Sequence, residues 1–165
     1  MLISLNKILY VAVDGVLTDG TILVSSDGSF IKRFNKEDFH YLKKWQKRGY
    51  YVVIMTSYKD DCIFHEFHSL DNYFKTNSIL LNDVDNKHSK LDLMLQRWGL
   101  NWNKVVSIGC YDDDLEIMER SRKSACPSNC GKEVKDGNVS YVLNVNSGKG
   151  LIREFYEIME QLNDF

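Results

Sequence analysis

The sequence predicts an α/β fold in which helices cover both faces of a parallel sheet. Short apolar runs rich in β-branched and aromatic residues, such as residues 8–13 and 50–55, alternate with segments whose apolar residues recur at helical spacing. This alternation is typical of a three-layer fold with right-handed crossovers. The first run ends at Asp14 and Gly15. We therefore expect Asp14 at the carboxyl edge of the sheet, where open α/β sheets bind ligands.

Length and composition predict one domain over residues 1–165. The chain has 165 residues, and 44% of them are hydrophobic. This is enough for one hydrophobic core but too little for two domains that each have a full core. The net charge is -2, with acidic and basic residues interspersed, so we expect neither a nucleic-acid partner nor a polybasic membrane anchor. No apolar stretch reaches membrane-spanning length and residues 1–7 show no secretory pattern, so we expect a cytoplasmic protein.

The four cysteines are expected to be reduced and mostly buried. They are widely spread, and the nearest pair, Cys126 and Cys130, has the wrong spacing for the usual zinc knuckles. A cytoplasmic compartment also disfavours disulfides. We therefore expect no disulfide or metal role for Cys62, Cys110, Cys126 and Cys130.

Residues 21–34 predict a β-hairpin. Two apolar runs, 21–25 and 30–34, flank residues 26–29, whose Asp-Gly pair is typical of a tight reversal. An isolated two-stranded ribbon is marginally stable in water. The hairpin is therefore expected to pack against its own domain or against another copy of the chain.

The remaining elements follow from the period of the apolar residues. In the first helix after the hairpin, Asn35 can cap the start and Gly49 the end. His65 and His68 lie on the next helix without further ligands nearby, so solvation or ordinary hydrogen bonds are expected for them. Strands are expected at 50–55, 78–81, 105–109, 124–126 and 141–143, and helices at 35–49, 60–70, 87–98, 131–136 and 151–162.

Residues 14–20, Asp-Gly-Val-Leu-Thr-Asp-Gly, resemble the first motif of the haloacid dehalogenase (HAD) phosphatase superfamily in the form used by its sugar-acid phosphatase branch. In that family the aspartate two positions before Asp14 attacks phosphorus, forms an aspartyl-phosphate and ligates magnesium. Ala12 occupies this position here, and a methyl group can do neither. The resemblance implies that Asp14 keeps the role of general acid and base and offers its backbone carbonyl to a metal.

Two more positions match the family's phosphate-binding residues. The resemblance implies that the Thr56 hydroxyl bonds phosphoryl oxygens and that Lys87, at a helix start, binds phosphate. Ser57 and Tyr58 replace the Gly-Arg pair that follows the hydroxyl in this branch. A hydroxyl at a strand end or a lysine at a helix start is common by itself. The agreement of Asp14, Thr56 and Lys87 in order and spacing is what supports a phosphate site.

The metal-binding motif of the family is altered. Its pattern, Gly-Asp-Asp-x-x-Asp, corresponds to residues 109–114, where an ungapped alignment places Cys110 and Tyr111 at the first two aspartates and leaves Asp114. A protonated thiol is a poor ligand for the hard cation Mg²⁺. Mg²⁺ is the cofactor that the resemblance implies, and we expect it to bind weakly if at all.

One alternative alignment stays open. A shift of one or two residues would bring Asp112 or Asp113 to the metal position. The loss of the family residue at Ala12, Cys110 and Tyr111 together indicates natural decay of catalysis rather than an engineered trap, which normally alters one residue. The candidate positions for a metal site are Asp14, Cys110, Asp113 and Asp114.

The resemblance runs along the whole chain and implies a three-layer, Rossmann-like HAD fold with a parallel sheet, a protruding hairpin and no cap domain. Residues 146–155 resemble a late motif of the branch, and residues 101–105 resemble the phosphatase-derived domain of acylneuraminate cytidylyltransferases. In the branch the hairpin builds a homotetramer and covers a neighbour's active site. Phe39 stands where the branch has small residues around the sugar, so it either fills that pocket or belongs to the core.

The leading interpretation is a catalytically impaired phosphatase homologue with an oligomeric structural or regulatory role in nonulosonate or sialic acid metabolism. Its expected partners are copies of itself, in a homotetramer held by the hairpin, and a sugar-acid phosphate or a nucleotidyltransferase. The alternative is an active Mg²⁺-dependent phosphatase of 3-deoxy-octulosonate 8-phosphate or a related sialic acid 9-phosphate. A third is a module that binds phosphate through Thr56 and Lys87 without chemistry.

Overall fold

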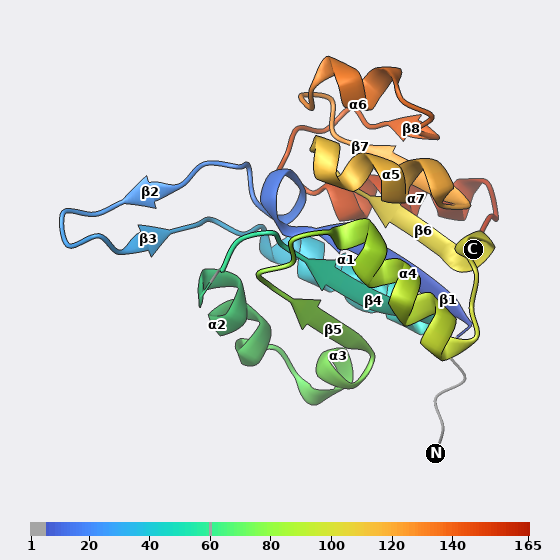
Figure 1. Ribbon diagram of the computed structural model, residues 1–165, viewed down its shortest axis with the longest axis horizontal. Helices are drawn as coiled ribbons and strands as arrows, with labels where there is room; N and C mark the ends of the chain where they lie inside the picture. Colours follow the sequence, from blue (N-terminus) through green and yellow to red (C-terminus); the bar gives the residue numbers. More distant parts are fainter. Residues whose placement is uncertain (1–5, 60) are drawn as a thin grey trace.

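A computed structural model describes residues 6–59 and 61–165. Its centre is a six-stranded parallel sheet in the order β5-β4-β1-β6-β7-β8, and a separate antiparallel pair, β2 and β3, forms the hairpin (Figure 1). This confirms the predicted α/β fold. The strands are β1 (Lys7–Ala12), β2 (Leu23–Val24), β3 (Phe30–Ile31), β4 (Tyr50–Met55), β5 (Ser78–Leu81), β6 (Val105–Ile108), β7 (Lys123–Cys126) and β8 (Tyr141–Val142).

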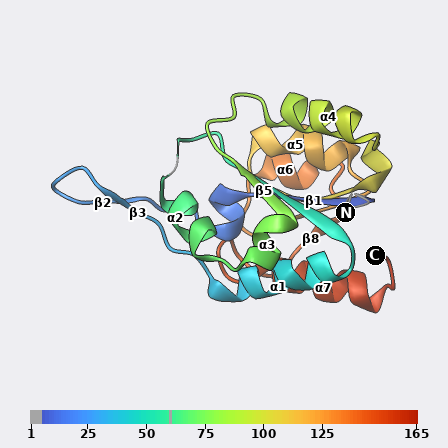
Figure 2. The ribbon, with the colours of Figure 1, turned by 90° about the horizontal axis from the view of Figure 1, so that it is seen from below.

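Helices form a layer on each face of the sheet. Figure 2 shows α1 and α7 together on one face and α4, α5 and α6 on the other, while α2 and α3 lie in the connection from β4 to β5. The helices are α1 (Lys36–Lys47), α2 (Asp61–Ser69), α3 (Asn72–Thr76), α4 (Lys87–Trp98), α5 (Asp112–Arg120), α6 (Lys132–Asp136) and α7 (Leu151–Gln161), with short turns η1 (Val13–Leu17) and η2 (Trp102–Lys104).

Most predicted elements coincide with observed ones, and two helices were not predicted. The strands expected at 50–55 and 78–81 are β4 and β5, and Asn35 caps α1 by accepting a hydrogen bond from the Glu37 amide. The helices α3 and α5 are additions to the prediction. Residue 60, the expected start of α2, and residues 1–5, on which the absence of a secretory pattern partly rests, lie outside the described residues.

The core is built on β1, whose residues 8–12 are fully buried. A parallel strand covered on both faces reads as a continuous apolar run, and this is the run that the sequence shows. Trp45 of α1 extends the core with edge-to-face contacts to the rings of Tyr50 and Tyr156. Phe39 is only 4% exposed and its ring packs against those of Phe34 and Phe74, which favours the core reading of this residue.

The hairpin projects away from the body of the molecule (Figure 1). Leu23 pairs with Ile31 and Val24 with Phe30, and all four apolar side chains are 56–64% exposed. Large apolar side chains gathered on an exposed ribbon are unusual for an isolated subunit. The hairpin therefore offers an apolar surface that its own domain does not cover.

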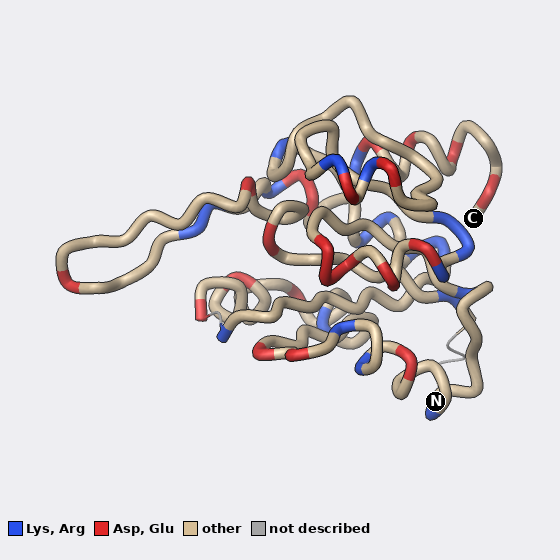
Figure 3. Tube along the Cα trace, turned by 45° about the horizontal axis from the view of Figure 1, so that its top comes forward, with Lys and Arg blue, Asp and Glu red and all other residues tan. Residues whose placement is uncertain are grey.

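Acidic and basic residues are interspersed over the surface, as the net charge of -2 suggests (Figure 3). In the described parts of the chain, no helix combines the length and the apolar character needed to cross a bilayer.

Candidate functional site

A cleft of about 410 Å³ opens at the carboxyl ends of β1, β4 and β6. In the sheet β1 lies between β4 and β6, and the strand order reverses at β1. Open α/β sheets usually bind ligands at the carboxyl ends of the strands beside such a reversal. It brings together most of the residues singled out from the sequence. The lining residues are Asp14, Gly20, Ile22, Thr56, Ser57, Tyr58, Lys87, Cys110, Tyr111, Asp112, Asp113, Gly131 and Val134.

The loop after β1 delivers Asp14 to this cleft. Ala12 closes the strand and is fully buried, and the chain then turns at Gly15, whose φ is +76°. A Cβ at Gly15 would lie 2.6 Å from the Cys110 Sγ, so the loop packs directly against the residue that follows β6. Glycine is needed here for both reasons.

The Asp14 carboxylate is held by three donors. Lys32 Nζ lies 2.9 Å and Thr18 Oγ1 3.3 Å from Oδ1, while Thr56 Oγ1 donates to Oδ2 at 3.2 Å. The Lys32 side chain is 6% exposed and that of Asp14 16%, so this is a nearly buried ion pair. Both oxygens of Asp14 are thus already engaged by protein groups.

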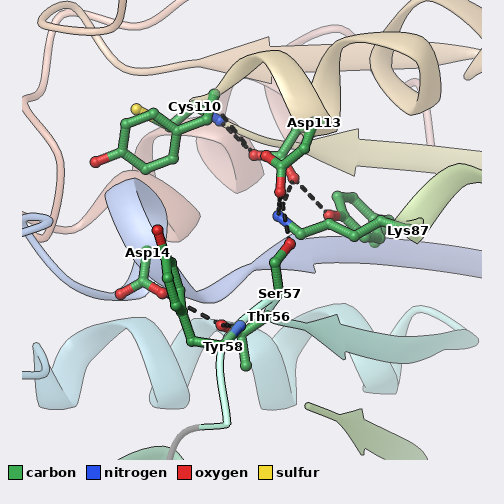
Figure 4. Close-up of polar contacts among 10 residues, drawn as sticks. Asp14, Thr56, Ser57, Tyr58, Lys87, Cys110 and Asp113 are labelled. Carbon is green, nitrogen blue, oxygen red and sulfur yellow. Dashed lines mark hydrogen bonds and ion pairs between the residues drawn. The ribbon is translucent and has the colours of Figure 1, made fainter. Parts of the chain in front are cut away.

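Lys87 is held by two carboxylates of α5. Its Nζ lies 2.8 Å from Asp113 Oδ2 and 2.8 Å from Asp114 Oδ1. Burial alone would lower the pKa of the Lys87 ammonium, but the two carboxylates outweigh this and the pKa is raised. Lys87 therefore stays charged and paired. Figure 4 shows Lys87 and Asp113 pointing at each other, with Ser57 beside them and Asp14 across the cleft.

Asp114 is a buried structural carboxylate in this arrangement. Besides Lys87 it accepts the Tyr10 hydroxyl at 2.6 Å and the amides of Cys110 and Tyr111 at 3.0 and 3.2 Å. Burial, followed by the Asp114 charge, raises the pKa of Tyr10 well above its ordinary value, so the phenol remains a donor. With these four donors, Asp114 caps the start of α5 and has little capacity left for another ligand.

Cys110 and Tyr111 follow β6 at the positions to which the ungapped alignment assigns the two aspartates of the family. Burial raises the pKa of the Cys110 thiol to about 11, so it is protonated at neutral pH, and its Sγ lies 3.8 Å from Ser147 Oγ. The side chain of Tyr111 packs closely against the loop that follows β1. A Cβ added at Gly20 would lie only 2.6 Å from the Tyr111 hydroxyl oxygen. A neutral thiol and a phenol thus stand at this end of the cleft.

These residues do not fit a magnesium ion. Ala12 offers no donor atom, and the Cys110 thiol is neutral. The carboxylates of Asp14 and Asp114 already bind protein donors, which leaves Asp14 only the backbone carbonyl that the resemblance assigns to a metal. Among the described residues, no group of three or more His, Cys, Asp or Glu side chains is placed to hold a metal. Mg²⁺ prefers an octahedral shell of oxygens, which this donor set does not supply.

Three contacts of the cleft were not anticipated. Lys32 reaches Asp14 from the hairpin, Ser57 Oγ donates to Asp113 Oδ2 at 2.7 Å, and Tyr10 donates to Asp114. Of these contacts, only that of Tyr10 could have been anticipated from the sequence, because a buried tyrosine hydroxyl needs a hydrogen-bond partner.

The expectation that most cysteines are buried is confirmed. All four cysteines are free; Cys110, Cys126 and Cys130 are buried, and Cys62 is partly exposed.

The sequence of the chain is similar to those of two kinds of curated protein. No protein-family model matches the chain. It is 25% identical over 155 residues to the 3-deoxy-D-manno-octulosonate 8-phosphate phosphatase KdsC of Haemophilus influenzae, covering 94% of this chain and 83% of that protein. It is 24% identical over 151 residues, 92% of this chain, to N-acylneuraminate cytidylyltransferase A of Danio rerio, and it spans about a third (34%) of that protein's length.

Solved structures decide the fold family. A probable YrbI family phosphatase from Pseudomonas syringae matches 99% of this chain and 90% of its own, with a TM-score of 0.85 and 26% identity. The chain has the KdsC (YrbI) phosphatase fold of the HAD superfamily. Another protein with this fold, the Moraxella catarrhalis octulosonate phosphatase, was crystallised with magnesium, phosphate and KDO; it matches 96% of this chain and 87% of its own at a TM-score of 0.83 and 23% identity.

The KdsC-type fold and the homology to part of a cytidylyltransferase confirm the family resemblance that the sequence indicated along the chain. The individual roles of Asp14, Thr56, Lys87 and the metal-site candidates stay predictions. Within the structure these side chains bind one another: Thr56 donates to Asp14, and Lys87 pairs with Asp113 and Asp114.

Proposed function

We propose that this protein is a catalytically impaired HAD phosphatase homologue with an oligomeric structural or regulatory role in sugar-acid metabolism. The observation that carries the proposal is Ala12. It closes β1 with a buried methyl group where the fold family places its attacking carboxylate, so covalent catalysis has no nucleophile at that position.

The donor set of the cleft supports the same proposal. A phosphatase of this type also needs a cation to neutralise the phosphoryl oxygens. Here Cys110 offers a neutral thiol, and Asp113 and Asp114 are bound to Lys87. Substitution of the nucleophile alone would leave a metal site behind, whereas this cleft has lost both.

Simple phosphate binding is less well supported than the structural role. Thr56 and Lys87 both line the cleft. Lys87, however, is neutralised by two carboxylates, and Asp14 and Asp112 add negative charge to the lining. A phosphate would have to displace Asp113 or Asp114 from Lys87 and approach further acidic groups.

The exposed hairpin supports an oligomeric role. Leu23, Val24, Phe30 and Ile31 present apolar side chains that the subunit itself does not cover. We propose that these side chains are buried between copies of the chain in a homotetramer. Since the chain resembles part of an N-acylneuraminate cytidylyltransferase, a nucleotidyltransferase that activates a sugar acid is the proposed functional partner.

The test is hydrolysis of 3-deoxy-octulosonate 8-phosphate and of a sialic acid 9-phosphate with Mg²⁺. The proposal expects no turnover above the uncatalysed rate. Turnover on the order of 1 per second or more, typical of enzymes, would overturn it.

The alternative function is an active phosphatase that has lost one residue. It is favoured by the convergence of Asp14, Thr56 and Lys87 in one cleft. If it holds, Ala12→Asp alone revives Mg²⁺-dependent hydrolysis. The proposal instead expects Ala12→Asp to stay inactive while Cys110 is unchanged, because the cation site would still lack a ligand.

A further inference from the structure

Lys32 does not line the cleft, but its ammonium reaches the lining residue Asp14, a contact that neither the motifs nor the fold family accounts for. It follows β3 at the root of the hairpin, and its Nζ is 2.9 Å from Asp14 Oδ1 with the side chain 6% exposed. Removing an ammonium from water is costly, and a carboxylate at hydrogen-bond distance offsets that cost. The ring of Tyr58, with its centroid 6.0 Å from Nζ, lies on the same side of the cleft.

We propose that the Lys32 ammonium is the resident counterion of the Asp14 carboxylate at the edge of this cleft. It neutralises the side chain of the residue whose backbone carbonyl the resemblance assigns to a metal, it disfavours a second cation beside it, and it fixes the hairpin root to the loop after β1. This inference rests on the proposed function, since it explains how the cleft remains stable once a metal site is lost.

The positions of the donors support this assignment. Lys32 takes Oδ1 of Asp14 and Thr56 takes Oδ2, so the carboxylate is neutralised and oriented by groups that cannot dissociate from the chain. A divalent cation at the backbone carbonyl of Asp14 would lie near an ammonium that already contacts the side chain of the same residue. At such short range, in a nearly buried site, the repulsion between the two cations is only weakly screened.

The neighbouring residue supplies a matched comparison. Arg33 Nη2 lies 2.8 Å from Asp19 Oδ2, so two consecutive cations of the hairpin bind two acids of the loop after β1. Figure 3 shows this basic stretch on the hairpin near its junction with the body. The Arg33 side chain is 74% exposed, and exposed ion pairs contribute little. Arg33→Met therefore removes the same charge one residue along without opening a buried pair.

The first experiment is amide hydrogen exchange on the full chain with Lys32→Met, Lys32→Arg and Arg33→Met. Lys32→Met is expected to speed exchange across residues 13–34 by about tenfold or more, because the buried pair no longer holds the hairpin root. Lys32→Arg and Arg33→Met are expected to stay within about threefold of the unsubstituted protein. Equal exchange in Lys32→Met and Arg33→Met would overturn the assignment.

The second experiment measures Mn²⁺ affinity by electron paramagnetic resonance in the Ala12→Asp/Cys110→Asp background, where carboxylates are restored. Adding Lys32→Met is expected to tighten Mn²⁺ binding by about tenfold or more, since a competing cation is gone, and adding Arg33→Met by less than about twofold. An unchanged affinity with Lys32→Met contradicts the inference. Turnover by the unsubstituted protein would contradict the proposed function instead, so the two failures are distinguishable.

Discussion

Asp38 lies in the first turn of α1 with its side chain fully buried, and its Oδ1 accepts a hydrogen bond from the Ile152 amide at 3.1 Å. Its Oδ2 has no hydrogen-bond partner within the described part of the chain. Burial raises the pKa of this carboxyl to about 7 from an ordinary 3.8, only partly opposed by the Ile152 amide. Asp38 connects the starts of α1 and α7 through this hydrogen bond. Ionisation of its carboxyl group therefore lowers the free energy of unfolding.

This predicts a stability that falls with rising pH. The pKa of Asp38 in the folded state lies above the pKa in the unfolded state, so the favourable protonated state is lost as pH rises from about 4 to about 7, on the order of 4 kcal/mol in all. Asp38→Asn keeps the acceptor for Ile152 and removes the charge. We expect the free energy of unfolding of the variant, measured by urea denaturation, to rise relative to that of the parent between about pH 4 and pH 7. Parallel pH curves for the two proteins would contradict this.

Lys87 is expected to be essential for stability whatever its relation to phosphate. Lys87→Met leaves the buried Asp114 without its ammonium, and breaking a buried pair costs about 3–5 kcal/mol. Lys90→Met, on the exposed face of the same helix, is the control and should change stability by less than about 0.5 kcal/mol. The measurement is the free energy of unfolding in urea. A loss below about 1 kcal/mol for Lys87→Met would show that Asp114 does not depend on it.

At the scale of elements, the segment before α7 is fixed against the cleft loop by Gly148. Its φ is +69°, and a Cβ there would lie 2.7 Å from the Asp19 amide nitrogen and 2.9 Å from the Thr18 carbonyl carbon. Gly99, at the end of α4, has a similar φ of +67° with open space around it. A side chain at either glycine would strain the backbone, but only at Gly148 would it also clash with neighbouring backbone atoms.

Gly148→Ala is therefore expected to destabilise the protein more than Gly99→Ala. The second substitution costs about 1 kcal/mol of left-handed strain, and the first adds a clash with backbone that cannot move aside, for about 3 kcal/mol or more in total. Thermal unfolding of both variants measures the difference. Equal losses would mean that the segment before α7 shifts freely away from the loop.

Elements whose residues are buried on a regular period could be predicted from the sequence, whereas the short α3 and the acidic start of α5 could not. β4 and β5 coincide with the apolar runs 50–55 and 78–81. The helix α5 was missed because residues 112–114 were interpreted as ligands following a strand. They form its first turn instead, where acidic side chains favour the amino-terminal dipole.

The site was predictable to the same extent. Asp14, Thr56 and Lys87 follow or precede strands that pair in the sheet, so order along the chain sufficed to bring them together. Lys32 lies on a projecting hairpin whose direction depends on contacts that no local pattern encodes. Its contact with Asp14, and with it the charge of the cleft, appears only in the structure.

At the scale of the whole molecule, the hairpin is expected to control the oligomeric state. Phe30→Glu places a charge on its exposed apolar surface and should shift the protein from tetramer to smaller species in sedimentation velocity. Tyr73→Glu, at a comparably exposed ring on α3, is the control and should leave the tetramer intact. A monomeric parent, or a tetramer that survives Phe30→Glu, would refute the role of the hairpin.

The proposed loss of catalysis rests on the methyl group of Ala12, the neutral thiol of Cys110 and the Lys32 ammonium on the Asp14 carboxylate. A crystal structure of the unsubstituted protein grown with Mg²⁺ and vanadate tests this most directly. We predict that Lys32 remains within hydrogen-bond distance of Asp14 and that no metal binds there. An octahedral Mg²⁺ held by Asp14 with Asp112 or Asp113, beside a bound vanadate, would contradict the account.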